Sequence, residues 1–220
     1  MPYPFIPYQP KILDIEEVEK EALAYFNNIN SRRSVREFSS KPVSKQTIEL
    51  IIKTASSAPS GANKQPWHFA AISNAALKSQ IRIAAEEEEQ RNYHERMSEE
   101  WLRDLEPLGT DEHKPFIEIA PWIIVMFKKA HDIVEGEKRK NYYVSESAGI
   151  AAGFLISAIH NAGLATLTHT PSPMDFLGKI LNRPANERAF LLLPVGYPAS
   201  DAMVPDISRK PLEKVATFYE

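Results

Sequence analysis

The stretch SKQTIELIIKTASSAPSGANKQPWHFAAIS, residues 44–73, contains the patterns of a helix, a turn-rich loop and a strand in succession. Ser44 is a helix-capping residue type, and we predict a helix over residues 44–56 that packs one face on a core. The apolar positions that recur at helical spacing are Ile48, Ile51, Ile52 and Ala55. After Pro66, the apolar and β-prone residues 67–73 predict a strand.

The rest of the chain alternates between the same two kinds of pattern. We predict helices over residues 14–30, from a cap at Asn74 to about residue 97, and over 140–161, and strands over 121–128, 164–168 and 189–195. The helix over 14–30 is also expected to pack one face on a core. This alternation is typical of an α/β or an α+β protein, and the residues alone leave both classes open.

Two segments depart from plain alternation. Residues 98–115 lose the periodicity and contain Pro107, Gly109 and many charges, so we predict a mobile lid rather than core, with bounds of about 90–115. The helix over 140–161 is rich in small residues, which let another backbone approach closely. These residues are Ala148, Gly149, Ala151, Ala152 and Gly153. We expect this helix to be central and tightly packed, at a dimer interface.

Length, composition and charge limit the classes of protein to which this chain can belong. The chain has 220 residues, of which 43% are hydrophobic and 25% charged, and this is typical of a globular protein with one domain over residues 1–220. Its 26 basic and 29 acidic residues give a net charge of −3. Because a nucleic-acid-binding protein normally carries a basic surplus, we expect no nucleic-acid partner.

Composition excludes further kinds of site. The chain has no cysteine, which rules out disulfides, thiolate metal sites and a thiol nucleophile. Its histidines lack helical metal-ligand spacing, so no metal site is expected. The first ten residues are rich in proline and lack the pattern of a signal peptide, and the apolar runs 119–127 and 148–159 are shorter than the roughly 20 residues that span a bilayer. We therefore predict a cytoplasmic protein without a membrane partner.

Two short motifs could bind a phosphorylated ligand. The run Arg32-Arg33-Ser34-Val35-Arg36 offers guanidinium groups and a hydroxyl that suit a phosphomonoester, although an ordinary solvated basic turn has the same composition. In residues 58–67, Gly61 allows backbone N–H groups to approach a ligand, although a plain connector would also look like this. No glycine-rich phosphate loop of a known nucleotide-binding type is present.

Together, the two motifs resemble those of the nitroreductase flavoproteins, which have R-R-S-x-R followed by A-P-S-x-x-x-x-Q-P-W. The resemblance implies an α+β, nitroreductase-like fold with a central mixed β-sheet flanked by helices, and a domain-swapped type of homodimer with a C-terminal arm over about 200–220. It also implies FMN as the cofactor. The implied cofactor-binding residues are Arg32, Arg33, Ser34, Val35, Arg36, Pro59, Ser60, Gly61, Thr168, His169, Thr170 and Arg209.

A second set of motifs is similar to the iodotyrosine deiodinase branch of that superfamily. It comprises E-E-E-E-x-x-N-Y-x-x-R-M from residue 86, W-x-x-D-L from 101, L-P-V-G-Y-P from 193, V-P-D from 204 and R-K-P-L from 209. The similarity extends over about residues 32–212. For an arbitrary protein, four consecutive glutamates would instead indicate a solvated helix surface.

The resemblance to this branch implies substrate-binding roles for Glu89, Tyr93 and Lys114, which would clamp the zwitterion of a halogenated tyrosine. The chemistry agrees, since Glu89 can pair with an ammonium, Lys114 with a carboxylate, and Tyr93 can donate a hydrogen bond. The backbone N–H of Ala62 would hold the phenolate oxygen. Thr170 would hydrogen-bond flavin N5 and act as the catalytic residue of a one-electron transfer.

The expected function is FMN-dependent reductive dehalogenation, converting 3-iodo-L-tyrosine to L-tyrosine and iodide by stepwise electron transfer from reduced flavin. Electrons would come from NAD(P)H through an external, unidentified reductase. The alternatives are a general FMN-dependent nitroreductase or quinone reductase that uses NAD(P)H, and a non-catalytic binder of halotyrosine or FMN. His169 departs from the threonine of vertebrate relatives, and no vertebrate-type membrane anchor is evident in the N-terminal residues.

Overall fold

The computed structural model describes residues 3–220, and the chain divides into two units, Met1–Arg32 and Arg33–Glu220. In the first unit, helix α1 (Ile15–Asn30) begins as predicted with Asp14 as its cap, and Glu17 completes a capping box. The helix buries none of its residues, so the expectation of a core-facing side is wrong for α1. The described residues of its own unit contain no second element to pack against. The single-domain expectation stays a prediction.

The second unit is built on a four-stranded sheet. Its order is β1 (Trp67–Ile72), β2 (Trp122–Lys129), β6 (Glu187–Gly196) and β5 (Ala165–Thr166), and each neighbouring pair is antiparallel. An isolated parallel bridge joins Ser34 to Thr166, so the sheet is mixed. The α+β class, the mixed sheet and the four predicted strands are therefore confirmed.

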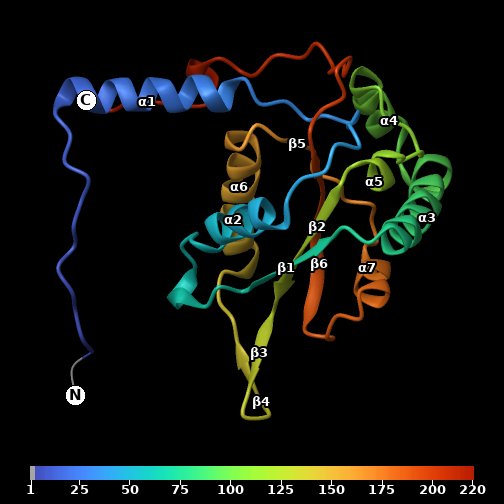
Figure 1. Cartoon of the computed structure of the whole chain (residues 1–220), viewed down its shortest axis with the longest axis horizontal. Helices are drawn as coiled ribbons and strands as arrows, with labels where there is room; N and C mark the ends of the chain where they lie inside the picture. Colours follow the sequence, from blue (N-terminus) through green and yellow to red (C-terminus); the bar gives the residue numbers. More distant parts are fainter. Residues whose placement is uncertain (1–2) are drawn as a thin grey trace. The chain divides into compact units, whose positions relative to one another are not determined.

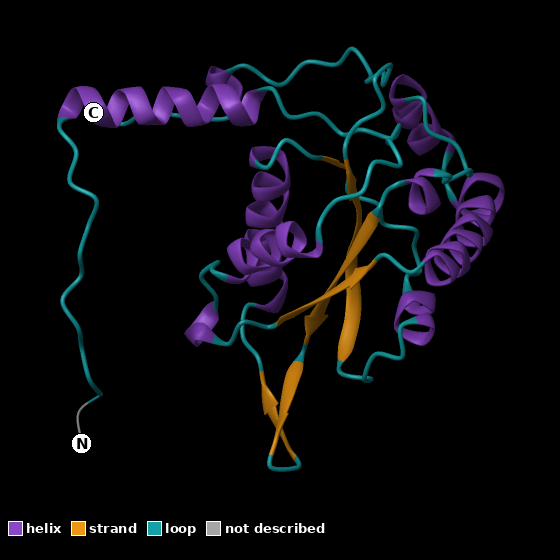
Figure 2. Ribbon diagram, viewed as in Figure 1, coloured by secondary structure: helices purple, strands orange, loops and turns teal. Residues whose placement is uncertain are grey.

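Helices cover both faces of this sheet (Figures 1 and 2). One face packs against α2 (Lys45–Ser56) and α6 (Val144–Asn161), and the other against α3 (Ala75–Arg91), α5 (Phe116–Ile119) and α7 (Asp175–Ile180). Strand β2 serves both cores, because successive side chains of a strand point to opposite faces. Ile124 packs with α2 and α6, whereas Ile123 and Val125 pack with α3 and α5.

The predicted lid segment contains more helix than its sequence indicated. Helix α3 runs into a single π-helical segment, η2 (Asn92–Arg96), and is followed by α4 (Glu99–Leu105) and the 3₁₀ turn η3 (Glu106–Leu108). Ser98 starts α4, since its hydroxyl accepts a hydrogen bond from the Trp101 N–H at 3.2 Å. Helix α4 buries no residue, in keeping with a segment outside the core.

The predicted helix over 140–161 begins too early. A hairpin of β3 (His131–Val134) and β4 (Glu137–Lys140) occupies the preceding residues, and α6 begins only at Val144. Glu135 and Gly136 have φ of 54° and 83°, the left-handed values that a two-residue hairpin turn requires. Tyr143 is also left-handed, with φ of 47°, which stops the helix from extending further towards the N-terminus.

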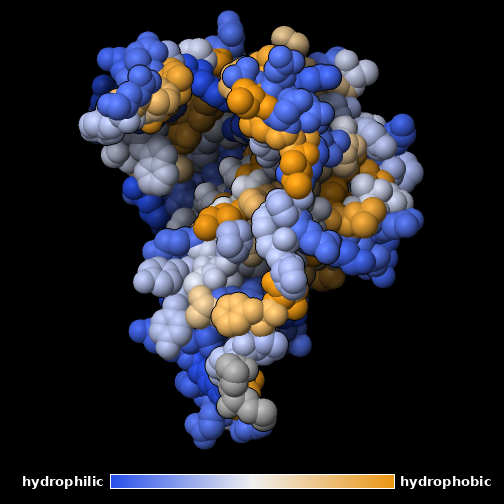
Figure 3. Space-filling view, turned by 90° about the vertical axis from the view of Figure 1, so that its left-hand side faces the viewer, coloured by the Kyte–Doolittle hydropathy of each residue, from blue (hydrophilic) through white to orange (hydrophobic). Residues whose placement is uncertain are grey.

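Apolar side chains also lie at the surface. Figure 3 shows orange, apolar patches on one face of the molecule. Among the exposed apolar side chains are Ile150 and Phe154 on α6, which are 43% and 40% exposed. On the same helix, a Cβ added at Gly149 or Gly153 would have no atom within 4 Å. Packing within this chain therefore does not require these two residues to be small. The chain ends beyond the 3₁₀ turn η4 (Leu212–Lys214), and no helix in residues 3–220 is both long and apolar enough to cross a bilayer.

Candidate functional site

The arginine motif lies along the C-terminal segment of the second unit. The Ala199 N–H donates a 3.0 Å hydrogen bond to the Glu37 carbonyl, and the Arg33 guanidinium donates to the carbonyl of Pro205. The two ends of this unit are thus held together, although they are far apart in the sequence. Arg209 follows four residues after Pro205 and is exposed. Arg32 belongs to the first unit.

Arg36 is a half-buried cation that makes no hydrogen bond or ion pair with another of the described residues, 3–220. Burial lowers the pKa of its guanidinium, and the nearby Tyr93 hydroxyl partly opposes this effect. A desolvated cation without an anionic partner is stabilised by binding an anion. With the neighbouring Ser34 hydroxyl and the Arg33 guanidinium, Arg36 therefore fits a phosphate group such as that of FMN.

Residues 168–170 lie beside β6 in an extended conformation. The His169 N–H donates to the Leu192 carbonyl at 2.8 Å, and the Leu192 N–H donates back at 3.0 Å. The imidazole is buried, while the side chains of Thr168 and Thr170 on either side of it are exposed, as the alternation of an extended chain requires. Two hydroxyl groups thus face away from the core, and the backbone N–H of His169 is already used within the sheet.

The threonine and arginine motifs lie in neighbouring extended segments. The Val35 N–H donates to the Thr166 carbonyl at 3.2 Å, next to the parallel bridge between Ser34 and Thr166. The residues expected to hold the FMN phosphate are therefore close to β5, and the threonines expected to contact the flavin ring system follow β5 directly, at positions 168 and 170. Sequence separation alone did not require this adjacency.

His169 is held neutral beneath this region. Burial lowers the pKa of its imidazole to about 3, and the positive charges of Lys114 and Arg36 add to the effect. The ring meets Phe116 edge-on, with centroids 5.6 Å apart, and its Nε2 atom is buried without a hydrogen-bond partner. Its backbone pairs with Leu192, so the described contacts of His169 are those of a core residue beside the site.

The three predicted substrate residues come together on the α3 side of the sheet. Glu89 lies near the end of α3, Tyr93 lies in η2, and Lys114 follows the lid. Lys114 Nζ lies 3.7 Å from Glu89 Oε2 and 5.6 Å from the centroid of the Tyr93 ring. Both charged side chains are buried, with 9% exposure for Glu89 and 3% for Lys114.

Burial dominates the electrostatics of this ion pair. It raises the pKa of Glu89, and the opposing attraction of Lys114 is the smaller effect. It also lowers the pKa of Lys114, against the attraction of Glu89 and Asp111 and with a further lowering by Arg36. Both shifts disfavour the charged forms, because the 3.7 Å contact only partly compensates for lost hydration. Additional opposite charges at this site would therefore be stabilising.

Two lid residues that the sequence did not single out complete the group. The Tyr93 hydroxyl donates to the Thr110 carbonyl at 3.0 Å, and burial raises the pKa of this phenol, so it stays protonated. Lys114 Nζ donates to Thr110 Oγ1 at 3.3 Å and to the carbonyl of Asp111. No local signal marks either residue, since each acts through its position in a folded loop.

The loop over residues 58–67 lies elsewhere in the chain. It contains the 3₁₀ turn η1 (Gly61–Asn63), where Ala62 and Asn63 have left-handed φ of 50° and 52°. The Gly61 N–H donates to Ser147 Oγ on α6 at 3.3 Å, and an added Cβ at Gly61 would lie 2.8 Å from the Tyr143 ring. This is the α2 and α6 side of the sheet, whereas the substrate residues lie on the α3 side (Figure 1).

The structure therefore does not bring Ala62 to Glu89, Tyr93 and Lys114 within one chain. Pro59 and Ser60 share the loop, and the Ser60 hydroxyl is used locally, accepting from the Gln65 N–H at 2.9 Å. Within residues 3–220, no group of three or more histidine, aspartate or glutamate side chains is placed to hold a metal ion.

Comparison with known proteins identifies what these features resemble. The model of the nitroreductase family matches residues 29–197. Iodotyrosine deiodinase of Haliscomenobacter hydrossis is 57% identical over 216 residues, which cover 98% of this chain and 97% of that protein. Iodotyrosine deiodinase 1 of Homo sapiens is 41% identical over 212 residues, which cover 96% of this chain and 73% of the human protein.

A solved structure agrees with these sequence matches. The crystal structure of an oxidized iodotyrosine deiodinase bound to FMN and 3-iodo-L-tyrosine superposes with a TM-score of 0.75 at 28% sequence identity, covering 88% of this chain and all of that chain. A BluB-like flavoprotein from Clostridium difficile has a TM-score of 0.67 at 22% identity and shares the fold.

Proposed function

The chain belongs to the nitroreductase family, within its iodotyrosine deiodinase branch, and from this premise we propose that the buried Glu89–Lys114 pair receives the charged end of a halotyrosine. The protein is an FMN-dependent oxidoreductase that deiodinates halotyrosines. In the overall reaction, the carbon–iodine bond of 3-iodo-L-tyrosine is replaced by a carbon–hydrogen bond. Two electrons and one proton are consumed, and iodide leaves.

The proposal rests on one observation. Glu89 and Lys114 both lose hydration on burial, and their 3.7 Å contact compensates for that loss only in part. A free amino acid has an ammonium and a carboxylate close together, and these charges match the two buried side chains with opposite sign. Inserted between them, the zwitterion would pair its ammonium with Glu89 and its carboxylate with Lys114. Two buried charges at 3.7 Å would thus become a chain of four alternating charges.

Tyr93 and the lid would complete this binding mode. The Tyr93 phenol is protonated and now donates to the Thr110 carbonyl; on substrate binding it can donate to the substrate carboxylate instead. Thr110 and Asp111 hold Lys114 Nζ in the structure, and both would release it to the incoming carboxylate. Exclusion of water by the lid residues strengthens each of these contacts, because charges interact more strongly at low dielectric constant.

The FMN site is assigned to the two motifs that lie side by side. Bound FMN supplies the electrons of the reaction. We assign Arg33, Ser34, Val35, Arg36 and Arg209 to its phosphate, and Thr168 and Thr170 to its ring system. The roles of Arg32, which belongs to the first unit, and of His169, whose imidazole is buried and whose backbone pairs with Leu192, stay predictions. The unpaired guanidinium of Arg36 supports the first assignment, and the exposed Thr168 and Thr170 hydroxyls support the second. Thr170 is proposed as the residue that donates a hydrogen bond to flavin N5.

A second copy of the chain is proposed to supply Pro59, Ser60, Gly61 and Ala62. Within one chain these residues lie on the opposite side of the sheet from Glu89. The exposed Ile150 and Phe154 and the unfilled space at Gly149 and Gly153 support α6 as a surface for that copy. The left-handed Ala62 can present its N–H to a phenolate oxygen there. The cytoplasmic location and the external NAD(P)H-driven reductase stay predictions.

The test uses the purified, FMN-loaded protein. Flavin fluorescence is followed during titration with 3-iodo-L-tyrosine and, separately, with 2-iodophenol, which lacks the zwitterion; dithionite is then added and iodide assayed. We expect tight binding of iodotyrosine only, followed by iodide release. Glu89→Gln should weaken iodotyrosine binding by about 10- to 100-fold with FMN retained, while Glu87→Gln, an exposed neighbour, should leave binding unchanged.

The alternatives give different results. A general nitroreductase would bind both ligands weakly and equally and release no iodide. A non-catalytic binder would bind iodotyrosine tightly, again without iodide release on reduction. Loss of FMN from the Glu89→Gln variant would contradict the assignment of Glu89 to the substrate.

A further inference from the structure

Lys114 is held at its backbone as well as at its ammonium. The Lys114 N–H donates a 2.6 Å hydrogen bond to Glu86 Oε1, while Lys114 Nζ faces Glu89. Glu86 and Glu89 lie three residues apart on α3 and therefore on neighbouring positions of one helix face. Two of the four consecutive glutamates thus hold the two ends of the same lysine.

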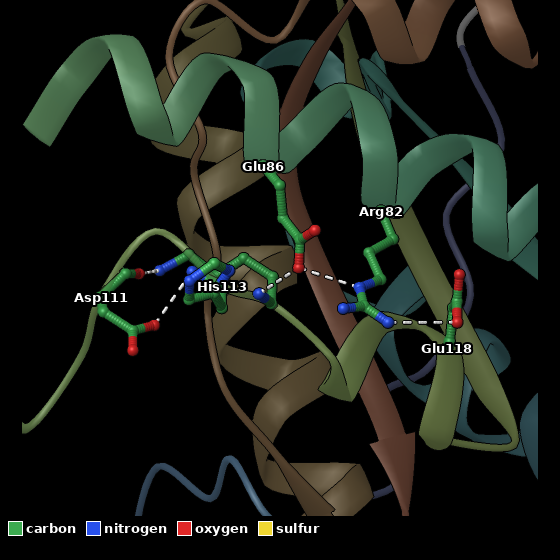
Figure 4. Close-up of polar contacts among 6 residues, drawn as sticks. Arg82, Glu86, Asp111, His113 and Glu118 are labelled. Carbon is green, nitrogen blue, oxygen red and sulfur yellow. Dashed lines mark hydrogen bonds and ion pairs between the residues drawn. The ribbon is translucent and has the colours of Figure 1, made fainter.

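Glu86 is itself fixed by a short chain of charged side chains, drawn in Figure 4. Arg82 Nε donates to Glu86 Oε1 at 2.8 Å, and Arg82 Nη1 donates to Glu118 Oε2 at 3.3 Å. The hydrogen bond with Glu86 raises the pKa of Arg82. Glu118 lies four residues after Lys114. The series of contacts therefore runs from Lys114 to Glu86 and Arg82 on α3, and from Arg82 back to the segment that contains Lys114.

A buried lysine one turn earlier on α3 contacts the same segment after the lid. Lys78 Nζ donates to the carbonyl oxygens of Glu118 and Ala120 at 2.8 and 2.7 Å. Lys78, Arg82 and Glu86 are spaced four residues apart and form one row on the helix. All three hold residues 114–120, the segment that directly follows the lid.

We propose that Glu86, oriented by Arg82 and Glu118, is a positioning residue that sets the place of the Lys114 ammonium for the substrate carboxylate. The proposal rests on the function proposed above and names a further residue of that site. A lysine side chain has four rotatable bonds, so its ammonium is placed only if its backbone is fixed. Without the Glu86 hydrogen bond, more conformational freedom must be lost when substrate binds.

Stability is a weaker explanation for this arrangement. The side chains of Arg82 and Glu118 are 30% and 36% exposed, and ion pairs at such partly exposed positions contribute little to the stability of the fold. The contact that is short and directed at the site is the one between Glu86 and the Lys114 N–H. A positioning role predicts a selective effect on ligands that carry a carboxylate.

The first experiment measures amide hydrogen exchange at Lys114 in the FMN-loaded protein and needs no substrate. Glu86→Ala removes the acceptor of the Lys114 N–H, whereas Glu87→Ala makes the same change at the adjacent exposed position. We expect Glu86→Ala to speed exchange at Lys114 by at least about tenfold and Glu87→Ala to leave it unchanged. Equal rates in the two variants would overturn the proposal.

The second experiment measures binding. Glu86→Ala should weaken 3-iodo-L-tyrosine binding by about tenfold and leave 2-iodophenol and FMN binding unchanged. Glu86→Gln keeps an acceptor oxygen for the Lys114 N–H and should recover part of the loss. In a Lys114→Met background, Glu86→Ala should have little further effect, because a residue that acts through Lys114 loses its influence with that ammonium.

The opposing outcomes are distinct. Equal loss of iodotyrosine and iodophenol binding, or loss of FMN, would make Glu86 a structural residue and overturn the positioning role. An undiminished effect of Glu86→Ala in the Lys114→Met background would also overturn it. Failure of the proposed function has another signature, in which the wild type binds both ligands alike and releases no iodide. That result would overturn the positioning role as well, whatever the exchange rate at Lys114.

Discussion

The two faces of the sheet bury different kinds of side chain. Under α2 and α6 the core consists of aliphatic residues such as Ile48, Leu155 and Ile159. The face under α3 and α5 has a similar apolar centre, yet the buried charged residues Lys78, Glu89 and Lys114 lie at its margin. A buried charge is costly unless it is compensated, so these positions are poor choices for stability alone. The difference distinguishes an apolar face, under α2 and α6, from a face with buried charges, which carries the residues proposed to bind the amino-acid end of the substrate.

The largest expected effect is a loss of stability on truncating a side chain of the apolar face under α2 and α6. Ile159 is fully buried, and Ile159→Ala should lower the free energy of unfolding by about 2–5 kcal/mol, because it leaves a cavity. The preference for iodotyrosine over iodophenol should not change. Urea unfolding and the two ligand titrations measure both quantities.

Ile83→Ala on α3 is the matched control, since this side chain is 56% exposed and its truncation should change stability by less than about 1 kcal/mol. A large change in ligand preference in the Ile159→Ala variant would show that the two faces are not separable.

The next effect is the pH dependence of the free energy of unfolding, to which the buried His169 contributes. The pKa of His169 is lowered to about 3 in the folded protein, against 6.5 in an unfolded chain. Below pH 6.5 the unfolded imidazole takes up a proton and the folded one does not, so stability present above pH 6.5 is lost as pH falls towards 3. Between pH 7 and pH 5 this loss is about 2 kcal/mol, and His169→Asn should abolish it.

Urea unfolding at both pH values tests this linkage, with the exposed His113 replaced by glutamine as the control. The comparison uses the difference between the two pH values, so an offset from repacking around Asn does not affect it. The same pH dependence in wild type and His169→Asn would contradict a neutral, buried His169.

The smallest effect distinguishes a core helix from a lid helix. Ser44 caps α2 by accepting a hydrogen bond from the Thr47 N–H at 3.1 Å, and Ser44→Ala should lower the free energy of unfolding by about 1 kcal/mol. Ser98 caps α4 in the same way, but α4 buries no residue. Ser98→Ala should therefore have a smaller effect on global unfolding, since α4 can open locally. Equal losses in the two variants would place α4 within the cooperative core.

Local patterns predicted the elements well where one signal dominated. The cap at Ser44 and the apolar stripe that follows it predicted α2, and the apolar, β-prone residues after Pro66 predicted β1. The sequence failed where a turn was set by backbone conformation, as at Glu135 and Tyr143, because residues other than glycine can adopt left-handed φ without any sequence signal. It also failed for α1, whose apolar residues find no core in their own unit.

The candidate site was predicted in part. The motifs identified Glu89, Tyr93 and Lys114, and the structure brings them together. Glu86 was read only as one member of a run of four, and Thr110 and Asp111 were not singled out. Their roles depend on hydrogen bonds to Lys114 and Tyr93 from a loop or across 28 positions of sequence, and no local pattern encodes such pairings.

By itself, the sequence determined the helices and strands with strong periodicity, the absence of thiol chemistry and the family, because these depend on residue type and spacing. Only the tertiary structure decided which glutamate holds which end of Lys114, that His169 is neutral, and that Ala62 lies apart from Glu89 within one chain. The physical reason is that burial and charge interactions act through space. Their strength depends on distances and solvent exposure, which are fixed only when distant segments pack together.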